Sequence, residues 1–218
     1  MTAKGTATSL PDFNVPDFLA RAQRHLHKLP PAHPSADAPR SGDDRYWKRP
    51  LTPQLLANAR DAAVLIPVIA HSTEPTILLT QRSSQLNKHS GQIAFPGGKI
   101  DPDESPLQAA LREAEEEIGL ASHLIEPLGY LDYYFTGTGY RIAPVVALIA
   151  PSFEIKINPD EVEDVFEVPL SFLMQSGNHH RVKRGDEGRS FLAMPYADRF
   201  IWGATAGMLR QLYERLYQ

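Results

Sequence analysis

Apolar residues recur at helical spacing in three stretches of the chain. Residues 13–29 predict an amphipathic helix that packs on the rest of the protein, and residues 204–217 predict a closing helix. The third stretch, 105–118, lies near the middle of the chain, and a shorter helix is expected over 53–60. The closing helix turns three leucines inward: Leu209, Leu212 and Leu216.

The central helix has clear signals at both ends. Ser105 is a good N-cap, Pro106 suits the first helical position, and Gln108 completes a capping box. Gly119 follows the last apolar turn and is suited to a left-handed C-cap. The helix is therefore predicted to run from 106 to 118.

Short apolar runs predict strands on both sides of that helix. The run 62–70 reads as a buried strand that forms a hairpin with 76–82, and 92–95 is a further short strand before a turn at 96–98. Two successive glycines in that turn allow positive φ and a close approach of the backbone to a ligand. Later strands are expected over 126–135, 141–149, 165–168, 189–196 and 199–202.

Strands before and after a central helix, with another helix at the end, predict an α/β domain over residues 51–218. Residues 1–50 form an N-terminal extension, in which the proline-rich segment 30–44 is expected to be a linker over the surface. Residues 176–188 are polar and are expected to form a flexible loop.

Composition narrows the class of protein. The 218 residues are 42% hydrophobic, so one sizeable core is expected. The formal net charge is -4, and without an excess of basic residues a nucleic-acid partner is not expected. The chain has no cysteine, which excludes disulfides and thiolate metal sites, and its eight histidines match no zinc motif. Without a signal peptide or an apolar run of membrane-spanning length, a cytoplasmic protein with no membrane partner is expected.

Three carboxylates share one arc of the central helix. At about 100° per residue, Glu113, Glu116 and Glu117 lie beside the apolar face, where like charges destabilise an isolated helix. A divalent cation removes that penalty, and Mg²⁺ or Mn²⁺ suits a site made only of carboxylate oxygens. Arg112 precedes Glu116 by four residues and is expected to reach Glu104, which would hold the carboxylates in place.

These residues resemble the signature of a known family. Gly98, Glu104 and the run from Arg112 to Leu120 match the Nudix box, a glycine and a glutamate followed by R-E-U-x-E-E-x-G-U with U aliphatic. The resemblance implies an α/β/α sandwich with a mixed sheet, here with a helical N-terminal extension. It also implies hydrolysis of a diphosphate.

The predicted site combines catalytic and metal-binding roles. Glu113, Glu116 and Glu117 are assigned as metal ligands, with Glu113 or Glu116 as a possible general base, while Arg112 and Glu104 support them. Since related enzymes recruit an acid from outside the box, Glu161 or Glu163 is a further candidate ligand or base. The alternative for these last two is an acidic surface segment.

A second resemblance concerns the substrate. The segments Leu78–Ser83, Gly91–Gly98 and Ile201–Ala206 are similar to those of the coenzyme A pyrophosphatase branch of the Nudix hydrolases. That branch cleaves coenzyme A to 3′,5′-ADP and 4′-phosphopantetheine, and a cation is needed to select the 3′-phosphate. The chain departs at Asn87, where relatives often carry arginine. The expected substrate-binding residues are Arg82, Ser83, Lys88, His89, Gly97 and Gly98, with Arg181, Lys183 and Arg184 as weaker candidates.

Other interpretations stay open at this point. The chain is alternatively a Nudix hydrolase of ADP-ribose or another nucleoside diphosphate derivative, or a ligand-binding module without activity. It is also a possible homodimer. The aromatic cluster of Tyr130, Tyr133, Tyr134 and Phe135 either packs in the core, which is favoured, or lines a base-binding cleft.

Overall fold

The fold is taken from a computed structural model that describes residues 12–32, 42, 45, 52–85, 90–184 and 189–218. The predicted substrate residues Lys88 and His89 lie outside the described residues, as does most of the proline-rich segment.

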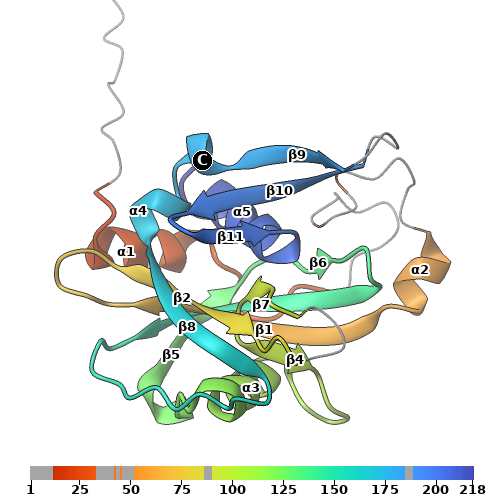
Figure 1. Cartoon of the computed structure of the whole chain (residues 1–218), viewed down its shortest axis with the longest axis horizontal. Coiled ribbons are helices and arrows are strands. Elements are labelled where there is room, and N and C mark those ends of the chain that lie inside the picture. Colours follow the sequence, from red (N-terminus) through yellow and green to blue (C-terminus); the bar gives the residue numbers. More distant parts are fainter. Residues whose placement is uncertain (1–11, 33–41, 43–44, 46–51, 86–89, 185–188) are drawn as a thin grey trace, which may run out of the picture.

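A mixed sheet forms the centre of the molecule (Figure 1). Strand β1 (Arg60–Ile69) pairs in parallel with β7 (Tyr140–Ile149) over ten consecutive residue pairs. The antiparallel strands β2 (Thr76–Arg82) and β5 (Ile125–Tyr130) flank this pair, and β8 (Val162–Pro169) pairs with β2. Most residues of the parallel pair are buried, as expected for apolar strands covered on both faces.

The predicted hairpin is confirmed, but its strands separate soon after the turn. β1 pairs directly with β2 only near the hairpin, at Val68 and Ile69. Further on, β3 (Ile93–Ala94) pairs with β2 and β4 (Gly97–Lys99) pairs with β1. The prediction of a turn at 96–98 was therefore wrong, because pairing with β1 draws the two glycines into a strand.

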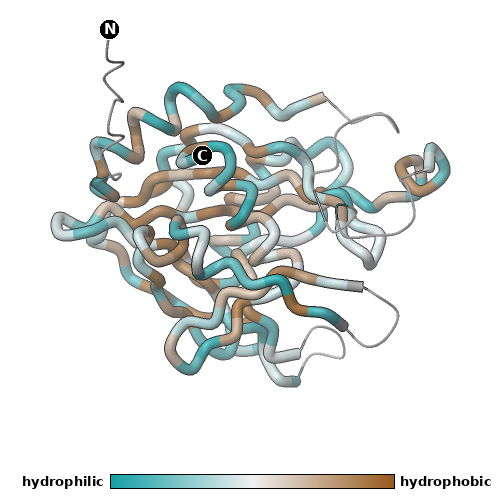
Figure 2. Tube along the Cα trace, turned by 90° about the horizontal axis from the view of Figure 1, so that it is seen from above, coloured by the Kyte–Doolittle hydropathy of each residue, from teal (hydrophilic) through white to brown (hydrophobic). Residues whose placement is uncertain are grey.

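Layers of different composition cover the two faces of the sheet (Figure 1). Helix α3 (Pro106–Ile118) lies on one face and packs through its alanines and Ile118. Helices α1 (Val15–His25) and α5 (Ala204–Leu216) lie on the other face, together with a small second sheet. Hydrophobic segments gather along the central strands and polar ones at the periphery (Figure 2).

The second sheet has the order β11-β10-β9. Strands β10 (Arg189–Tyr196) and β11 (Arg199–Trp202) occur where the sequence predicts them. Strand β9 (His180–Arg184) contradicts the prediction of a flexible loop over 176–188, because β10 pairs with these polar residues. A charged edge strand resembles a loop in sequence, since edge strands commonly carry charged side chains.

The remaining elements are short. The strand predicted over 126–135 is divided, because residues 131–133 leave the ladder before β6 (Tyr134–Phe135). All four residues of the aromatic cluster are buried, as the favoured interpretation predicted. The other short elements are α2 (Pro53–Ala57), α4 (Leu170–Leu173), and the 3-10 turns Ser122–Leu124 and Ser176–Asn178.

Helix α1 belongs to the same core as the C-terminal helix. Phe18, Ala22 and Leu26 are buried in one cluster with the three inward leucines of α5. At its C-terminal end, His27 pairs with the backbone of Tyr130. The predicted packing of this helix on the domain is confirmed. Among the described helices, none has the length and apolarity needed to cross a membrane.

Candidate metal and diphosphate site

Helix α3 begins and ends as its sequence requires. The Ser105 hydroxyl accepts a hydrogen bond from the Gln108 backbone N–H, and the Gln108 side chain accepts one from the Ser105 N–H. Gly119 closes the helix in the left-handed region with φ 69°. These caps fix the rotation of the helix on the sheet, and hence the direction in which its glutamates point.

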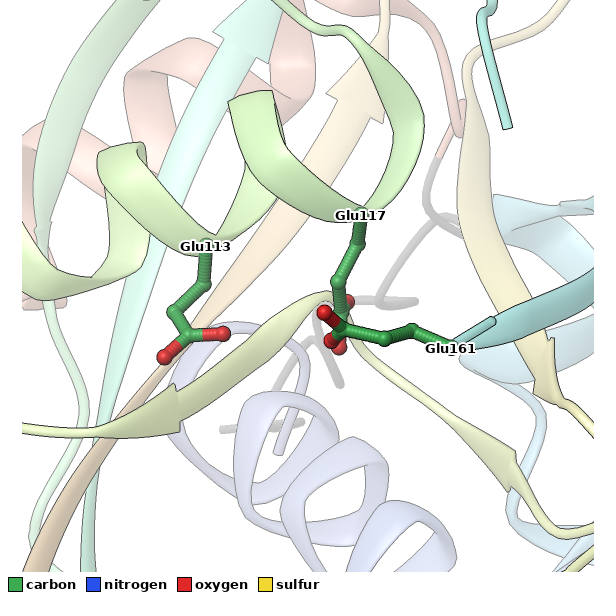
Figure 3. Close-up of side chains that lie close together, drawn as sticks. All are labelled: Glu113, Glu117 and Glu161. Atoms are coloured by element: carbon green, nitrogen blue, oxygen red, sulfur yellow. The ribbon is translucent and has the colours of Figure 1, made fainter. Parts of the chain in front are cut away.

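Three carboxylates converge beside the C-terminal half of α3. One oxygen each from Glu113, Glu117 and Glu161 lies within 4.8 Å of the others. Figure 3 shows Glu113 and Glu117 extending from successive turns of α3, while Glu161 extends from the segment beside the helix toward Glu117. Three acidic oxygens at this separation, without a histidine or cysteine, have the donor chemistry that Mg²⁺ and Mn²⁺ prefer.

Two glycines of β4 form the wall opposite these carboxylates. The Gly97 N–H donates to Glu117 Oε2 at 3.2 Å, and the φ of Gly97 is 156°. A Cβ on Gly98 would lie 2.1 Å from Glu113 Oε1. The pair therefore allows the glutamates to approach the backbone closely, in agreement with the close approach expected from the sequence.

Burial makes this cluster electrostatically unfavourable when no cation is bound. The side chain of Glu117 is 2% exposed, and burial raises its pKa to about 8, although Arg82 and the Gly97 N–H oppose that rise. Burial also raises the pKa of Glu113, against the effect of Arg112. A divalent cation compensates buried carboxylates of this kind, so the residues present fit such an ion.

Arg112 holds three acids of the box together. Its Nε and Nη2 donate to the two carboxylate oxygens of Glu104, each at 3.0 Å. Its Nη1 donates to Glu113 at 3.0 Å and to Glu116 at 3.1 Å. The predicted contact between Arg112 and Glu104 is confirmed, and these hydrogen bonds lower the pKa of Glu104 and raise that of Arg112.

Glu116 lies outside the group of three. Its side chain is 54% exposed, and its carboxylate accepts a hydrogen bond from Arg112. Arg82, in contrast, lies beside the group, with Nη1 3.6 Å from Glu117 Oε1. An arginine at that position is placed to contact phosphoryl oxygens next to the carboxylates.

A loop that precedes β8 carries Glu161 to the site. The Asn158 N–H donates to the Glu117 carbonyl, and the Ser83 N–H donates to the Glu161 carbonyl, each at 2.9 Å. The Asn158 side chain also donates to Glu161 Oε1 at 3.3 Å. Asn158 was not among the predicted site residues, and the turn-forming sequence Asn158-Pro159-Asp160 was the signal that could have identified it.

The predicted substrate residues do not all face the carboxylates. Ser83 is buried, and its hydroxyl accepts a hydrogen bond from the Gln85 N–H, so this residue shapes the turn after β2. Arg181 and Lys183 lie on β9 of the second sheet. The segment Ile201–Ala206 joins β11 to α5, and the buried Thr205 hydroxyl donates to the Ile93 carbonyl at 2.9 Å. Two of the three segments of the second resemblance thus contact each other.

Comparison with known proteins gives consistent matches. The family model of the NUDIX domain matches residues 59–185. The chain is 44% identical over 168 residues to the uncharacterized Nudix hydrolase NudL of Escherichia coli K12, covering 75% of this chain and 86% of the relative. It is 45% identical over 159 residues to NudL of Citrobacter koseri, covering 71% and 82%.

The fold also resembles solved structures. The crystal structure of RenU, a Nudix hydrolase from M. smegmatis, aligns with a TM-score of 0.50 and 20% identity, covering 72% of this chain and 84% of that one. At this identity the similarity concerns the fold.

Proposed function

The chain belongs to the Nudix family of hydrolases, which act on diphosphate anhydrides, and on that premise we propose that it hydrolyses the diphosphate of coenzyme A or an acyl derivative. The products are 3′,5′-ADP and 4′-phosphopantetheine, or its acyl form. The observation that carries the hydrolytic part of the proposal is the convergence of Glu113, Glu117 and Glu161.

Glu113, Glu117 and Glu161 would hold one or more Mg²⁺ or Mn²⁺ ions, and the more exposed Glu116 is a further candidate ligand. When bound, such an ion shields the negative charge of the diphosphate and makes water more acidic. Arg112 keeps Glu113 and Glu116 oriented, and Gly97 orients Glu117 through its N–H. These contacts preserve the site's geometry while substrate binds and leaves.

The reaction transfers a phosphoryl group to water. The water oxygen adds to one phosphorus, the bond from that phosphorus to the bridging oxygen breaks, and each half leaves as a phosphate monoester. A carboxylate of this chain accepts the proton of the water, and Glu113, Glu116 and Glu161 are the candidates.

One observation supports coenzyme A as the substrate, and a second supports a diphosphate substrate of any kind. The chain carries the segments Leu78–Ser83, Gly91–Gly98 and Ile201–Ala206, which are similar to those of the coenzyme A branch. The first of these segments brings Arg82 to the carboxylates, where its guanidinium would contact the diphosphate. The 3′-phosphate contact expected for Arg82 and Lys88 stays a prediction, and Lys88 lies outside the described residues.

Product analysis tests the proposal directly. The purified protein is incubated with coenzyme A, dephospho-coenzyme A or ADP-ribose in Mg²⁺ or Mn²⁺, and the products are separated and identified. We expect coenzyme A to be turned over faster than its dephospho form. Equal rates for all three would remove the case for a 3′-phosphate site and favour a general nucleoside diphosphate hydrolase. Binding without turnover would indicate a ligand-binding module.

A matched pair of variants on α3 links the activity to the site. Glu117→Gln removes a buried carboxylate of the group, whereas Glu115→Gln makes the same change at an exposed position of the same helix. We expect the first variant to lose at least about 100-fold in kcat/KM and the second to keep the wild-type value. Full activity in Glu117→Gln would contradict the assigned site.

A further inference from the structure

Arg199 joins the second sheet to the main sheet through a charged fork. From β11, its Nη1 donates to Gln81 Oε1 and its Nη2 to Asp164 Oδ2, both at 2.6 Å. Its guanidinium also lies over the ring of Phe166, 4.6 Å from the centroid. Gln81 and Asp164 are direct cross-strand partners on β2 and β8, so a single side chain holds both strands at this pair.

This pair is the last regular one before a bulge. Gln81 pairs with Asp164, whereas the next residue, Arg82, pairs with Val162, which leaves Glu163 as an extra residue in β8. A bulge bends its strand and changes the direction of nearby side chains. The regular hydrogen bonds between strands fix the register less firmly at a bulge. Charge-assisted hydrogen bonds from one arginine to both strands stabilise the register there.

The residues beyond the bulge are those that face α3. Arg82 reaches Glu117, and the Ser83 N–H holds the carbonyl of Glu161. Since side chains alternate along a strand, Gln81 points toward the layer of α5 and the second sheet, while Arg82 points toward α3. Arg199 therefore contacts the opposite face of the sheet from the carboxylates and reaches them only through the backbone.

We propose that Arg199 is a positioning residue of the metal site, because it fixes the bulge that brings Glu161 and Arg82 to the carboxylates of α3. The inference rests on the proposed function, since it assumes that Glu161 helps to bind the cation. Its consequence is that the second sheet, which supplies none of the three carboxylates, determines how tightly the cation is held.

Mn²⁺ affinity tests this inference without relying on turnover. Free Mn²⁺ is followed by electron paramagnetic resonance during titration of the wild type, Arg199→Ala and Arg215→Ala. Arg215 is the matched control, because it forms an ion pair with Asp132 in which both side chains are about as exposed as Arg199 and Asp164 are in theirs. Arg215 lies at the C-terminal end of α5, and its partner Asp132 is on neither β2 nor β8. We expect Arg199→Ala to weaken Mn²⁺ binding about 10- to 100-fold, and Arg215→Ala to leave it unchanged.

A double variant separates positioning from general destabilisation. If Arg199 acts through Glu161 and Arg82, its replacement in a Glu161→Gln background should weaken binding by much less than in the wild type. An undiminished loss in that background would overturn the inference, as would wild-type affinity in Arg199→Ala. Arg199→Lys, which keeps the charge but not the fork, should recover only part of the affinity.

Two further results are also informative: an Arg199→Ala variant that does not fold, and a wild type that binds no Mn²⁺. If Arg199→Ala does not fold, Asp164→Ala removes one acceptor at a more exposed position, and it should weaken Mn²⁺ binding several-fold. Unchanged affinity in that variant overturns the inference. If the wild type itself binds no Mn²⁺, the proposed function falls and this inference with it, whereas binding that is insensitive to Arg199 overturns this inference alone.

Discussion

The Cα of Gly98 and the carboxylate of Glu113 are so close that no side chain fits between them. An added Cβ would lie 2.1 Å from Oε1 and 2.4 Å from the carboxyl carbon. The atoms that it would meet are the end of a flexible side chain, not backbone. The glycine of the box is thus required by the position of a candidate ligand rather than by the fold.

Gly98→Ala should therefore disable the site without unfolding the protein. The added methyl group forces the Glu113 carboxylate to a new position, and we expect Mn²⁺ affinity and kcat/KM to fall by about 10- to 100-fold with little change in melting temperature. Titration with Mn²⁺ and thermal unfolding measure the two effects separately. Wild-type affinity in this variant would show that Glu113 can bind the ion from another rotamer.

Two other glycines serve as controls for this prediction. A Cβ on Gly177 would have no atom within 4 Å, so Gly177→Ala should change neither property. A Cβ on Gly97 would lie 2.4 Å from the carbonyl oxygen of Ala63, and the backbone there has positive φ. We expect Gly97→Ala to lower the melting temperature, because the clash is with the central strand.

Cation binding should depend on pH through Glu117. Its pKa of about 8 means that the carboxyl group holds a proton at neutral pH in the cation-free protein, and a bound ion must displace that proton. Mn²⁺ affinity is expected to rise with pH between 6 and 8, by up to about tenfold per unit, and to level off above that range. Glu116→Gln should keep this dependence. A flat profile in the wild type would contradict the assignment.

The same group should affect stability in the opposite direction. Its pKa is raised on folding from 4.5, so its stabilising contribution is complete below about 4.5 and is lost as the pH rises through about 8. Glu117→Gln removes this loss, and its stability relative to the cation-free wild type should grow by up to about 1.4 kcal/mol per pH unit over this interval. Urea unfolding at several pH values, with a chelator present, measures the difference.

Arg112→Lys should weaken Mn²⁺ binding although the charge is kept. Lysine cannot form the two parallel hydrogen bonds to Glu104 while it also contacts Glu113 and Glu116. We expect a loss of about 10- to 100-fold in Mn²⁺ affinity. Arg210→Lys is a suitable control, since Arg210 pairs with Glu214 on α5 and is about equally exposed. Equal effects of the two changes would argue against a specific role for Arg112.

Local signals in the sequence were sufficient to predict much of the fold. The caps of α3, the hairpin of β1 and β2, and the strands β10 and β11 occur where they were predicted. In each case the determining residues are neighbours in the chain. The Gly97-Gly98 pair was read as a turn because glycine favours turns locally, whereas pairing with β1 makes it a strand.

In the site, too, local spacing predicted some residues, whereas others depend on long-range strand pairing. Glu113 and Glu117 lie on one helix, so their spacing alone places them together. The approach of Glu161 depends on the pairing of β2 with β8 and on a bulge in that pairing, neither of which has a local signature. Arg199 lies 35 residues from Asp164 and 118 from Gln81, and no spacing rule connects them.

The N-terminal extension leads to a final prediction, because its helix is outside the matched family domain and yet is part of the core. Phe18 is fully buried in the same core cluster as the leucines of α5. Phe18→Ala should therefore lower the free energy of unfolding by about 3–5 kcal/mol, whereas Leu29→Ala, at a residue that is 77% exposed, should change it by less than about 0.5 kcal/mol. Denaturant unfolding measures both. A small effect of Phe18→Ala would mean that the domain reaches its full stability without α1; a large one would mean that a fragment beginning at residue 51 lacks part of its own core.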